Sequence, residues 1–330
     1  MFLAWKEFKK GKSSKPDVQE FEFNLEDNIF QLHDDLKTKS YRHNLYISFY
    51  VTDPKLRHIH KACVRDRVLH HAIFRILYPI FDQNFIYDSY SCRLGKGTHR
   101  AVNRLEDFTR KLSCNNHRTI YALKCDVRKF FDSIDKTILT RIITNKIKDG
   151  DSLWLISKIL NSFSKTLEKG LPLGNVTSQI FANIYLNELD QYVKHRLKVK
   201  YYLRYCDDFI ILDRDPHYLL ELASKINEFL EEHWALSLHP NKVLLRKYQQ
   251  GVDFLGYVVL PYHRTIRTRT RNRVINKIVN KREESYSNFI SQESLGQSLN
   301  SYRGILKHCN GYELEEELIW LSGWAEIEIK

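Results

Sequence analysis

The stretch RYCDDFIILD, residues 204–213, places two adjacent carboxylates, Asp207 and Asp208, between apolar residues. Asp-Asp is common in turns, because a short polar side chain can hydrogen-bond to its own backbone there. On these ten residues alone, a polar turn is the better explanation. Catalysis becomes the better interpretation only if carboxylates from elsewhere in the chain join this pair.

The composition indicates a basic globular protein. Of its 330 residues, 52 are Lys or Arg and 40 are Asp or Glu, a formal net charge of +12. The length predicts about two domains, or one domain with subdomains. The basic excess indicates a polyanion partner. Six cysteines show neither CxxC nor zinc-type Cys/His spacing, so we expect reduced structural thiols, and we expect no metal role for the histidines.

No segment approaches the roughly 18 continuous apolar residues of a membrane span. The start, MFLAWKEFKKGK, has too short an apolar stretch for a signal peptide. We therefore expect a cytoplasmic protein without a membrane partner.

The first half of the chain shows several regular patterns. Apolar residues at helical spacing predict a helix within 21–39, and alternation predicts a strand running into Asp53-Pro54. RVLHHAIFRILYPIF (67–81) predicts a buried helix that ends at Pro79. TIYALKCD (119–126) predicts a buried strand ending in Asp126, and 131–147 a capped helix after it.

The second half continues with an irregular loop at 170–176 and a helix over 178–193. The apolar residues around Cys206-Asp207-Asp208 predict a tight hairpin with the carboxylates at its tip. A helix (217–233), a loop with Lys242, a strand pair (252–260) and at least one helix around 298–309 follow. Eight Lys or Arg fall between Arg264 and Arg282, which suggests a boundary near residue 262. Strands and helices mix without regular alternation, which predicts an α+β fold with a mostly antiparallel sheet.

If the strand that ends at Asp126 neighbours the hairpin, three carboxylates converge on one spot. Buried anions repel one another unless a cation lies among them. Oxygen ligands without His or Cys select magnesium or manganese. Two such ions about 4 Å apart would activate a 3′-hydroxyl and stabilise a leaving pyrophosphate.

The hairpin motif TyrCysAspAsp (205–208) resembles the YxDD box of reverse transcriptases. Further boxes resemble that family in the same order and together cover roughly residues 40–310: PKLRHIHKACVRDRVLHHA (54–72), GKGTHRAV (95–102), KCDVRKFFDSID (124–135), GLPLGNVTSQ (170–179), LHPNKVLL (238–245) and VDFLGYVV (252–259). The resemblance implies a right-hand polymerase with fingers, palm and a helical thumb. The corresponding divisions are 1–122, 123–262 and 263–330.

The resemblance also implies roles for the acidic centre. Asp126, Asp207 and Asp208 would hold two Mg²⁺ ions, with Mn²⁺ as a substitute, and Asp207 would be the closer partner of Asp126. Lys242 matches the lysine proposed in the family as proton donor to pyrophosphate. These four residues are the expected catalytic set.

A second group of residues matches the family's dNTP site. Lys55 and Arg57 fall where the fingers bind the triphosphate, although a solvated surface charge is the alternative. Phe131 falls at the steric gate that excludes a ribose 2′-hydroxyl; the alternative is core packing. Leu173 and Gly174 would lie against the nascent base pair, where glycine allows close approach of the backbone.

The expected partners are an RNA template, a DNA or RNA primer with its cDNA, and dNTPs. The thumb arginines would follow a nucleic-acid backbone, whereas a solvated helix face is their alternative. The residues expected to contact template or primer are Arg65, Lys96, Thr98, Tyr205, Arg267, Arg269, Arg271 and Arg273.

Departures from the common pattern narrow the subtype. Leu173 stands where retroviral and group II intron enzymes usually have Gln, and Ser178-Gln179 stands where intron enzymes usually have Ser-Pro. Both features resemble the reverse transcriptases of diversity-generating retroelements, which copy an RNA with frequent errors opposite adenine. Those enzymes act with a small basic oligomeric accessory protein, which this chain could also need. Leu173 could make the active site less strict about base-pair geometry, or it could simply pack against neighbouring side chains.

Two rival functions stay open. A related bacterial reverse transcriptase in antiphage defence would use the same chemistry, and a catalytically silent relative would only bind nucleic acid. Residues 264–330 are too short for both a thumb and an endonuclease, so we expect any cleavage of target DNA to come from another protein.

Overall fold

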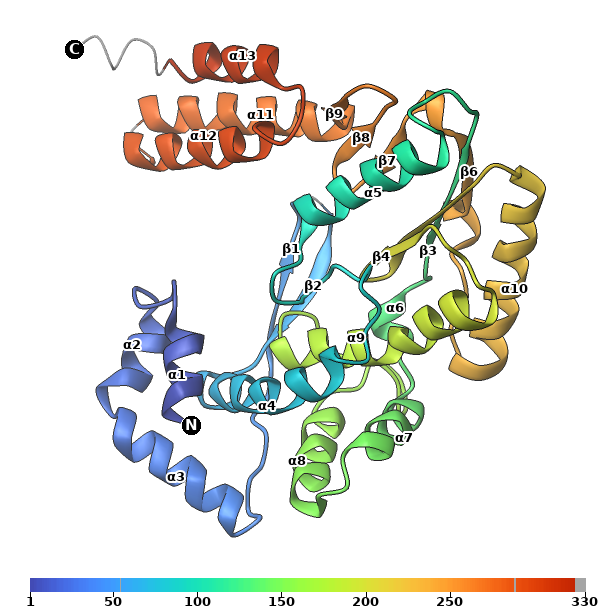
Figure 1. Cartoon of the computed structure of the whole chain (residues 1–330). Coiled ribbons are helices and arrows are strands. Elements are labelled where there is room, and N and C mark those ends of the chain that lie inside the picture. The colour runs from blue at the N-terminus through green and yellow to red at the C-terminus, as the bar shows by residue number, and fades with distance from the viewer. Residues whose placement is uncertain (54, 288, 324–330) are drawn as a thin grey trace. The chain divides into compact units, whose positions relative to one another are not determined.

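The computed structural model describes residues 1–53, 55–287 and 289–323. It is an α+β structure of helices and small sheets (Figure 1). The chain forms two compact units, each made of several separate segments. The first unit comprises Met1–Lys96, Lys124–Phe209 and Glu221–Val243, and the second comprises Gly97–Leu123, Ile210–Leu220 and Leu244–Lys330.

The N-terminal part of the first unit is a small helical bundle on α4 (Figure 1). Trp5, Phe8, Phe21 and Val68 belong to its buried core. The helix predicted within 21–39 is confirmed, and two helices that were not predicted precede it. The bounds are α1 Phe2–Lys9, α2 Pro16–Phe23, α3 Leu25–Lys37 and α4 Val64–Asp82.

The prediction that Pro79 ends its helix is wrong. Helix α4 continues past Pro79 to Asp82. Pro79 lies on the exposed face, whereas Leu77, Tyr78 and Phe81 around it are buried. Burial of these apolar side chains offsets the loss of one backbone hydrogen bond at the proline.

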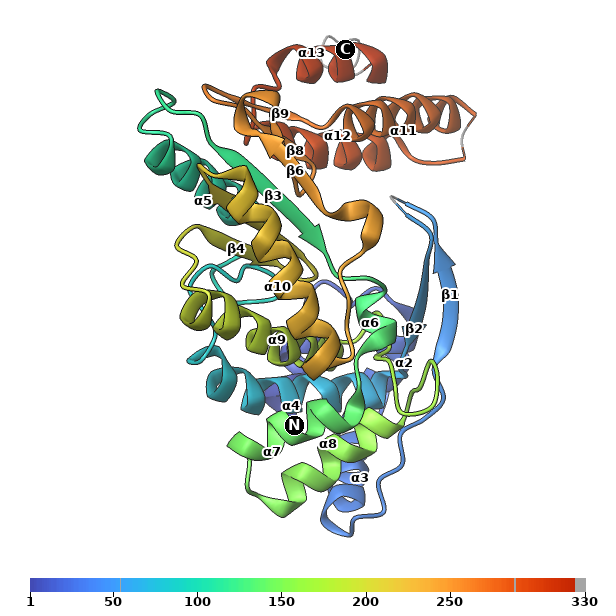
Figure 2. The same cartoon turned by 90° about the vertical axis from the view of Figure 1, so that its right-hand side faces the viewer.

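Strands β1 (Ile47–Val51) and β2 (Arg57–Lys61) form a separate antiparallel ribbon, as Figure 2 shows. Val51 pairs with Arg57 at the end of the ribbon nearest the turn. The strand predicted before Asp53 is confirmed as β1, and its partner β2 was not predicted.

The remaining helices of the first unit lie between residues 130 and 242, except that residues 216–220 at the start of α10 belong to the second unit. The single helix predicted over 131–147 is instead two, because Asp135 accepts hydrogen bonds from the amides of Thr137 and Ile138 and begins a new helix there. The loop at 170–176 and the following helix are confirmed. The bounds are α6 Phe130–Ser133, α7 Lys136–Lys146, α8 Gly150–Asn161, α9 Val176–Gln191, a π-helical turn Tyr192–Arg196, α10 Pro216–Trp234 and a 3₁₀ turn Pro240–Lys242.

A four-stranded sheet carries the order β4-β5-β3-β6. Strand β3, predicted from TIYALKCD, is therefore the direct neighbour of β5, the second strand of the predicted hairpin. The bounds are β3 Tyr121–Asp126, β4 Tyr202–Tyr205, β5 Asp208–Asp213 and β6 Leu244–Lys247.

The second unit contains a three-stranded antiparallel sheet, β7-β8-β9, and a C-terminal helical bundle. Val274, Ile278, Leu299 and Leu318 belong to the buried core of the bundle. The predicted strand pair and the predicted helix around 298–309 are confirmed. The bounds are α5 Thr98–Leu112, a 3₁₀ turn Tyr248–Gln250, β7 Val252–Phe254, β8 Tyr257–Val259, β9 Arg264–Ile266, α11 Thr268–Tyr286, α12 Gln292–Leu306 and α13 Tyr312–Ser322.

Among the residues that the structure describes, no helix is both long and apolar enough to cross a membrane.

Candidate active site

The pair of adjacent aspartates occupies the turn of the β4–β5 hairpin. Cys206 and Asp207 form the turn itself, and Asp208 is the first residue of β5. Cys206 adopts a left-handed conformation with φ of 55°, which is unusual for a residue other than glycine. The predicted hairpin with carboxylates at its tip is confirmed.

The end of β3 lies against this turn. The amide of Val127, which follows Asp126, donates a hydrogen bond to the carbonyl of Asp207 over 3.2 Å. Asp126 is buried, with 9% of its surface exposed. The structure therefore brings Asp126, Asp207 and Asp208 together, as the sequence predicted.

The electrostatics of the turn reflect this convergence. Burial, and then the charge of Asp126, raise the pKa of Asp207 above its ordinary value. Burial also raises the pKa of Asp208 to about 6, with Lys124 opposing the shift and the charges of Asp207 and Asp126 adding to it. Carboxylates that raise one another's pKa form a centre that attracts cations.

Lys242 supplies one cation to this centre. Its Nζ donates to Oδ1 of Asp126 over 2.7 Å, from the 3₁₀ turn after α10. The Lys242 side chain keeps 38% of its surface exposed, against 13% for Asp126. The predicted lysine therefore lies at the carboxylates, although the contact by itself does not assign it a proton-transfer role.

The donor chemistry of the centre fits a magnesium or manganese ion. The three carboxylates supply hard oxygen donors. Burial, and then the neighbouring carboxylates, raise the pKa values of Asp207 and Asp208, so a cation bound there would offset both effects. As the side chains stand, however, no group of three or more His, Cys, Asp or Glu within 1–53, 55–287 and 289–323 is arranged to hold a metal ion. Lys242 bonds Oδ1 of Asp126, so Oδ2 would be the oxygen that ligates a metal ion while this contact is kept.

The sequence did not predict a buried ion pair between β4 of the hairpin and α9. The Arg204 guanidinium donates to both carboxylate oxygens of Asp190 on α9, over 2.7 and 2.6 Å, and both side chains are fully buried. Arg204 also donates to the carbonyl of Cys206 over 3.0 Å, within the turn of the β4–β5 hairpin. A charged residue in an otherwise apolar strand was the available signal, because a buried arginine requires a buried partner.

The loop at 170–176 is bound to β2. The amide of His60 donates to the carbonyl of Leu173 over 2.9 Å, and the Asn175 side chain donates to the carbonyl of His60 over 2.9 Å. Gly174 has φ of 110°, and a Cβ there would lie 2.9 Å from Cγ2 of Ile59. The structure thus gives a reason for glycine that the sequence did not: close packing on β2.

Phe131 is accessible on the side of this loop. Its carbonyl accepts from the amide of Leu171 over 2.8 Å, while its ring remains partly exposed. The neighbouring Phe130 takes the core position, with 2% of its surface exposed. The two rings lie 5.4 Å apart, edge to face. Packing therefore accounts for Phe130 more fully than for Phe131.

The two cations predicted to bind the triphosphate lie at the turn end of the β1–β2 ribbon. Lys55 is in the connecting turn and Arg57 begins β2, and both are exposed. Their exposure is compatible with either a triphosphate contact or a solvated charge.

The residues predicted to contact template or primer in the first unit differ in their surroundings. Arg65 is bound by Asp35 and by the carbonyl of Arg42, so its guanidinium has a structural use here. Lys96 donates to the carbonyl of Tyr87 over 2.8 Å, and Tyr205 ends β4, next to the catalytic turn. Their nucleic-acid contacts stay a prediction.

The other predicted contact residues belong to the second unit. Thr98 begins α5, and Arg267 precedes α11 and pairs with Asp253. Arg269, Arg271 and Arg273 lie on α11, where Arg271 also donates to Glu317 over 2.7 Å.

The chain matches the model of a known protein family. The model of the family "Reverse transcriptase (RNA-dependent DNA polymerase)" matches residues 52–259, more than half of the chain. Protein YkfC of Escherichia coli is 24% identical over 274 residues, which cover 71% of this chain and 70% of YkfC. Group II intron-encoded protein LtrA of Lactococcus lactis is 30% identical over 154 residues, 44% of this chain and 24% of LtrA.

Solved structures support the fold independently of sequence. Apo telomerase from Candida tropicalis superposes with a TM-score of 0.54 at 14% identity, over 86% of this chain and 59% of that one. Telomerase from Candida albicans, solved with a fragment of telomeric RNA, gives 0.52 at 10% identity, over 87% and 61%. The chain spans about a quarter of LtrA and about 60% of these telomerase chains.

The fold is a right-hand fold of the reverse transcriptase type. The chain belongs to the reverse transcriptase (RNA-dependent DNA polymerase) family.

Proposed function

We propose that this chain synthesises cDNA on an RNA template by adding dNTPs to a primer 3′-end. The observation that supports this most strongly is the meeting of Asp126, Asp207 and Asp208 at the ends of adjacent strands. Asp126 and Asp207 would hold both Mg²⁺ ions, with Asp208 as an auxiliary ligand. The ions would activate the 3′-hydroxyl and stabilise the departing pyrophosphate.

The surrounding residues would bind and select the substrate. Lys55 and Arg57 would bind the triphosphate, and the exposed part of the Phe131 ring would exclude a 2′-hydroxyl. Lys242, already placed at Asp126, would donate a proton to pyrophosphate. Residues 263–330 would act as the thumb, with the arginines of α11 along the nucleic-acid backbone.

The main experiment is dNTP incorporation on a primed RNA with magnesium. Wild type should extend the primer, and Asp207→Ala should lower the rate by at least about 10³-fold, because a ligand common to both ions is lost. Equal extension by both proteins would contradict the assignment of the site. If wild type does not extend the primer even with its cognate RNA and an accessory protein, the binding-only function becomes the better one.

We further propose an error-prone enzyme of a diversity-generating retroelement, acting with a small basic accessory protein. Support comes from the residues Leu173, Ser178 and Gln179, which depart from the intron-type pattern. Leu173 is partly exposed beside Gly174, and an aliphatic side chain cannot form the polar contacts of a glutamine amide.

Sequencing the cDNA tests this subtype. Errors should concentrate opposite template adenine, and Leu173→Gln should reduce them several-fold. Accurate synthesis by wild type would favour a role in antiphage defence. An error spectrum unaffected by Leu173→Gln would show that Leu173 has only a packing role.

A further inference from the structure

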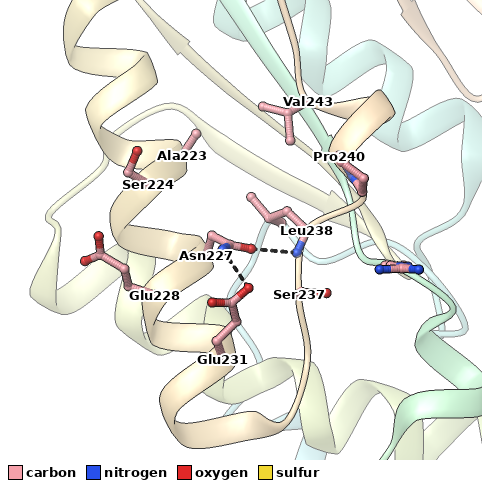
Figure 3. Close-up of a pocket in the computed structure, with 10 residues that line it drawn as sticks. Ala223, Ser224, Asn227, Glu228, Glu231, Ser237, Leu238, Pro240 and Val243 are labelled. Carbon is pink, nitrogen blue, oxygen red and sulfur yellow. Dashed lines mark hydrogen bonds between the residues drawn. The ribbon is translucent and has the colours of Figure 1, made fainter.

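The segment that presents Lys242 runs alongside α10 in the first unit. Residues 237–243 follow the end of α10 and fold back beside it, as Figure 3 shows. A cavity of about 570 Å³ lies between helix and segment. Its lining includes Ala223, Ser224 and Asn227 of α10 and Leu238, Pro240 and Val243 of the segment.

Asn227 connects the helix to the segment. Its Oδ1 accepts a hydrogen bond from the amide of Leu238 over 2.9 Å. Its Nδ2 donates to Oε1 of Glu231, one helical turn later, over 2.9 Å. Figure 3 shows both bonds. Because Glu231 accepts only, its contact fixes the Asn227 amide with the oxygen toward Leu238.

The segment is bonded on its other side to the catalytic strand. The amide of Arg128 donates to the carbonyl of Ser237 over 2.9 Å, and the amide of His239 donates to the carbonyl of Asp126 over 2.8 Å. A rigid 3₁₀ turn then leads from His239 to Lys242, whose amide donates back to the carbonyl of His239 over 2.9 Å. Any shift of residues 238–239 therefore moves Lys242 relative to Asp126.

Apolar packing and the Asn227 bond together hold the segment on the helix. Leu238 of the segment and Ala223 of α10 are both buried, with 7% and 8% of their surfaces exposed. Apolar packing is not directional, so the directional hydrogen bond from Leu238 is better suited to fix the register of the segment along the helix. Leu238 receives one such bond from the helix side, while its neighbours bond to the strand side.

We propose that Asn227 is a positioning residue that holds segment 237–243, and thereby Lys242, in register with Asp126. Glu231 supports it by fixing the orientation of its amide. The inference rests on the proposed function, since it takes Lys242 to act in nucleotide addition.

Asn227→Leu tests the inference, because it preserves approximate size and removes both hydrogen bonds. The single-turnover rate of nucleotide addition should fall about tenfold, with the KM for dNTP unchanged within about twofold. Glu228→Leu is the matched control, because Glu228 follows Asn227 in the sequence and lines the same cavity. This variant should leave the rate of nucleotide addition unchanged. Thermal unfolding of each variant identifies any loss caused by misfolding.

Two further variants separate positioning from general destabilisation. Asn227→Asp combined with Glu231→Gln reverses the polarity of the side-chain bond and keeps an acceptor for Leu238, so it should restore the rate to within about threefold of wild type. In a Lys242→Ala background, Asn227→Leu should cause little further loss. Losses that simply multiply, or a failed rescue in a stably folded protein, would overturn the proposal.

Hydrogen exchange decides the positioning claim without polymerase activity. Asn227→Leu should speed exchange at the amides of Leu238 and His239 about tenfold, with α9 unaffected. Unchanged exchange there would overturn the inference even in an active enzyme. If Asn227→Leu speeds exchange as expected but the wild-type protein extends no primer, the result would instead contradict the proposed function.

Discussion

Two clusters of buried charge lie within a few residues of each other on the β4–β5 hairpin, and their compositions are opposite. Below the turn, Arg204 meets Asp190 in a fully buried, two-bond ion pair, and its other donors reach Ser89 and the carbonyl of Cys206. At the turn, Asp207 and Asp208 face Asp126, and their pKa values are raised.

The difference separates structure from chemistry. A buried charge that has an opposite charge beside it, and whose hydrogen-bond donors are all satisfied, favours a single conformation of the surrounding chain. Such a charge has little remaining attraction for a ligand. A cluster of like charges destabilises the folded state and attracts a cation. We therefore attribute architecture to the first cluster and reactivity to the second.

The largest expected effect is the loss of stability when the buried Arg204–Asp190 ion pair is broken. Asp190→Asn should lower the free energy of unfolding by about 3–5 kcal/mol, because it leaves the buried Arg204 charge uncompensated. Chemical denaturation measures this loss. The matched control is Asp151→Asn, which removes an exposed pair with Lys39 and should change stability by less than about 0.5 kcal/mol. Similar losses of stability at both sites would mean that the buried ion pair contributes no more to the architecture than an exposed one.

Arg204→Lys should have a smaller effect, about 2 kcal/mol. Lysine keeps the charge but cannot reproduce the planar fork that reaches Asp190 and the carbonyl of Cys206 together. The turn should loosen, so primer extension at a temperature where the variant is fully folded should fall several-fold. A stable variant with full activity would show that the fork does not support the turn.

Much of this arrangement is readable from sequence. The alternation and termini of TIYALKCD and the hairpin around Asp207 predict the two strands, because apolar periodicity and turn residues are local signals. The meeting of Asp126 with the hairpin was conditional on their being neighbours, and the sheet order satisfies that condition.

Other features depend on tertiary contacts. Pro79 lies within α4 because its neighbours are buried, and no local rule measures that burial. The partner of Arg204 is fourteen residues away on another element, and Asn227 acts through the backbone of Leu238. Such pairings have no sequence signature in a single chain, since any of many polar residues could fill each role.

The acidic cluster should respond in the opposite sense to the matched pair. Asp208→Asn should raise the free energy of unfolding by about 2 kcal/mol in the presence of a chelator, because it removes a charge that burial, and then the charges of Asp207 and Asp126, disfavour. Primer extension should fall, since a neutral amide is a poorer metal ligand. Asp132→Asn, an exposed carboxylate on α6, should leave stability unchanged. A chelated Asp208→Asn protein less stable than wild type would contradict the repulsion.

The raised pKa of Asp208 predicts how the free energy of unfolding changes with pH. Its pKa is about 6 in the folded protein, against an ordinary value of 3.8, so the folded state binds this proton more tightly than the unfolded state does. The stabilisation that comes from protonated Asp208 is therefore fully present below about pH 4, and it is lost as the pH rises through 6.

The stability advantage of Asp208→Asn over wild type, measured in chelator, should thus be near zero at pH 4 and reach its full value above pH 6. Subtracting the two curves removes the titration of carboxylates remote from the turn, which both proteins share. Saturating Mg²⁺ should reduce the advantage above pH 6, because a bound cation offsets the repulsion in wild type. An advantage that is constant from pH 4 to 7 would mean that Asp208 is not held against its neighbours' charge, and that the two clusters on the hairpin differ less than their geometry indicates.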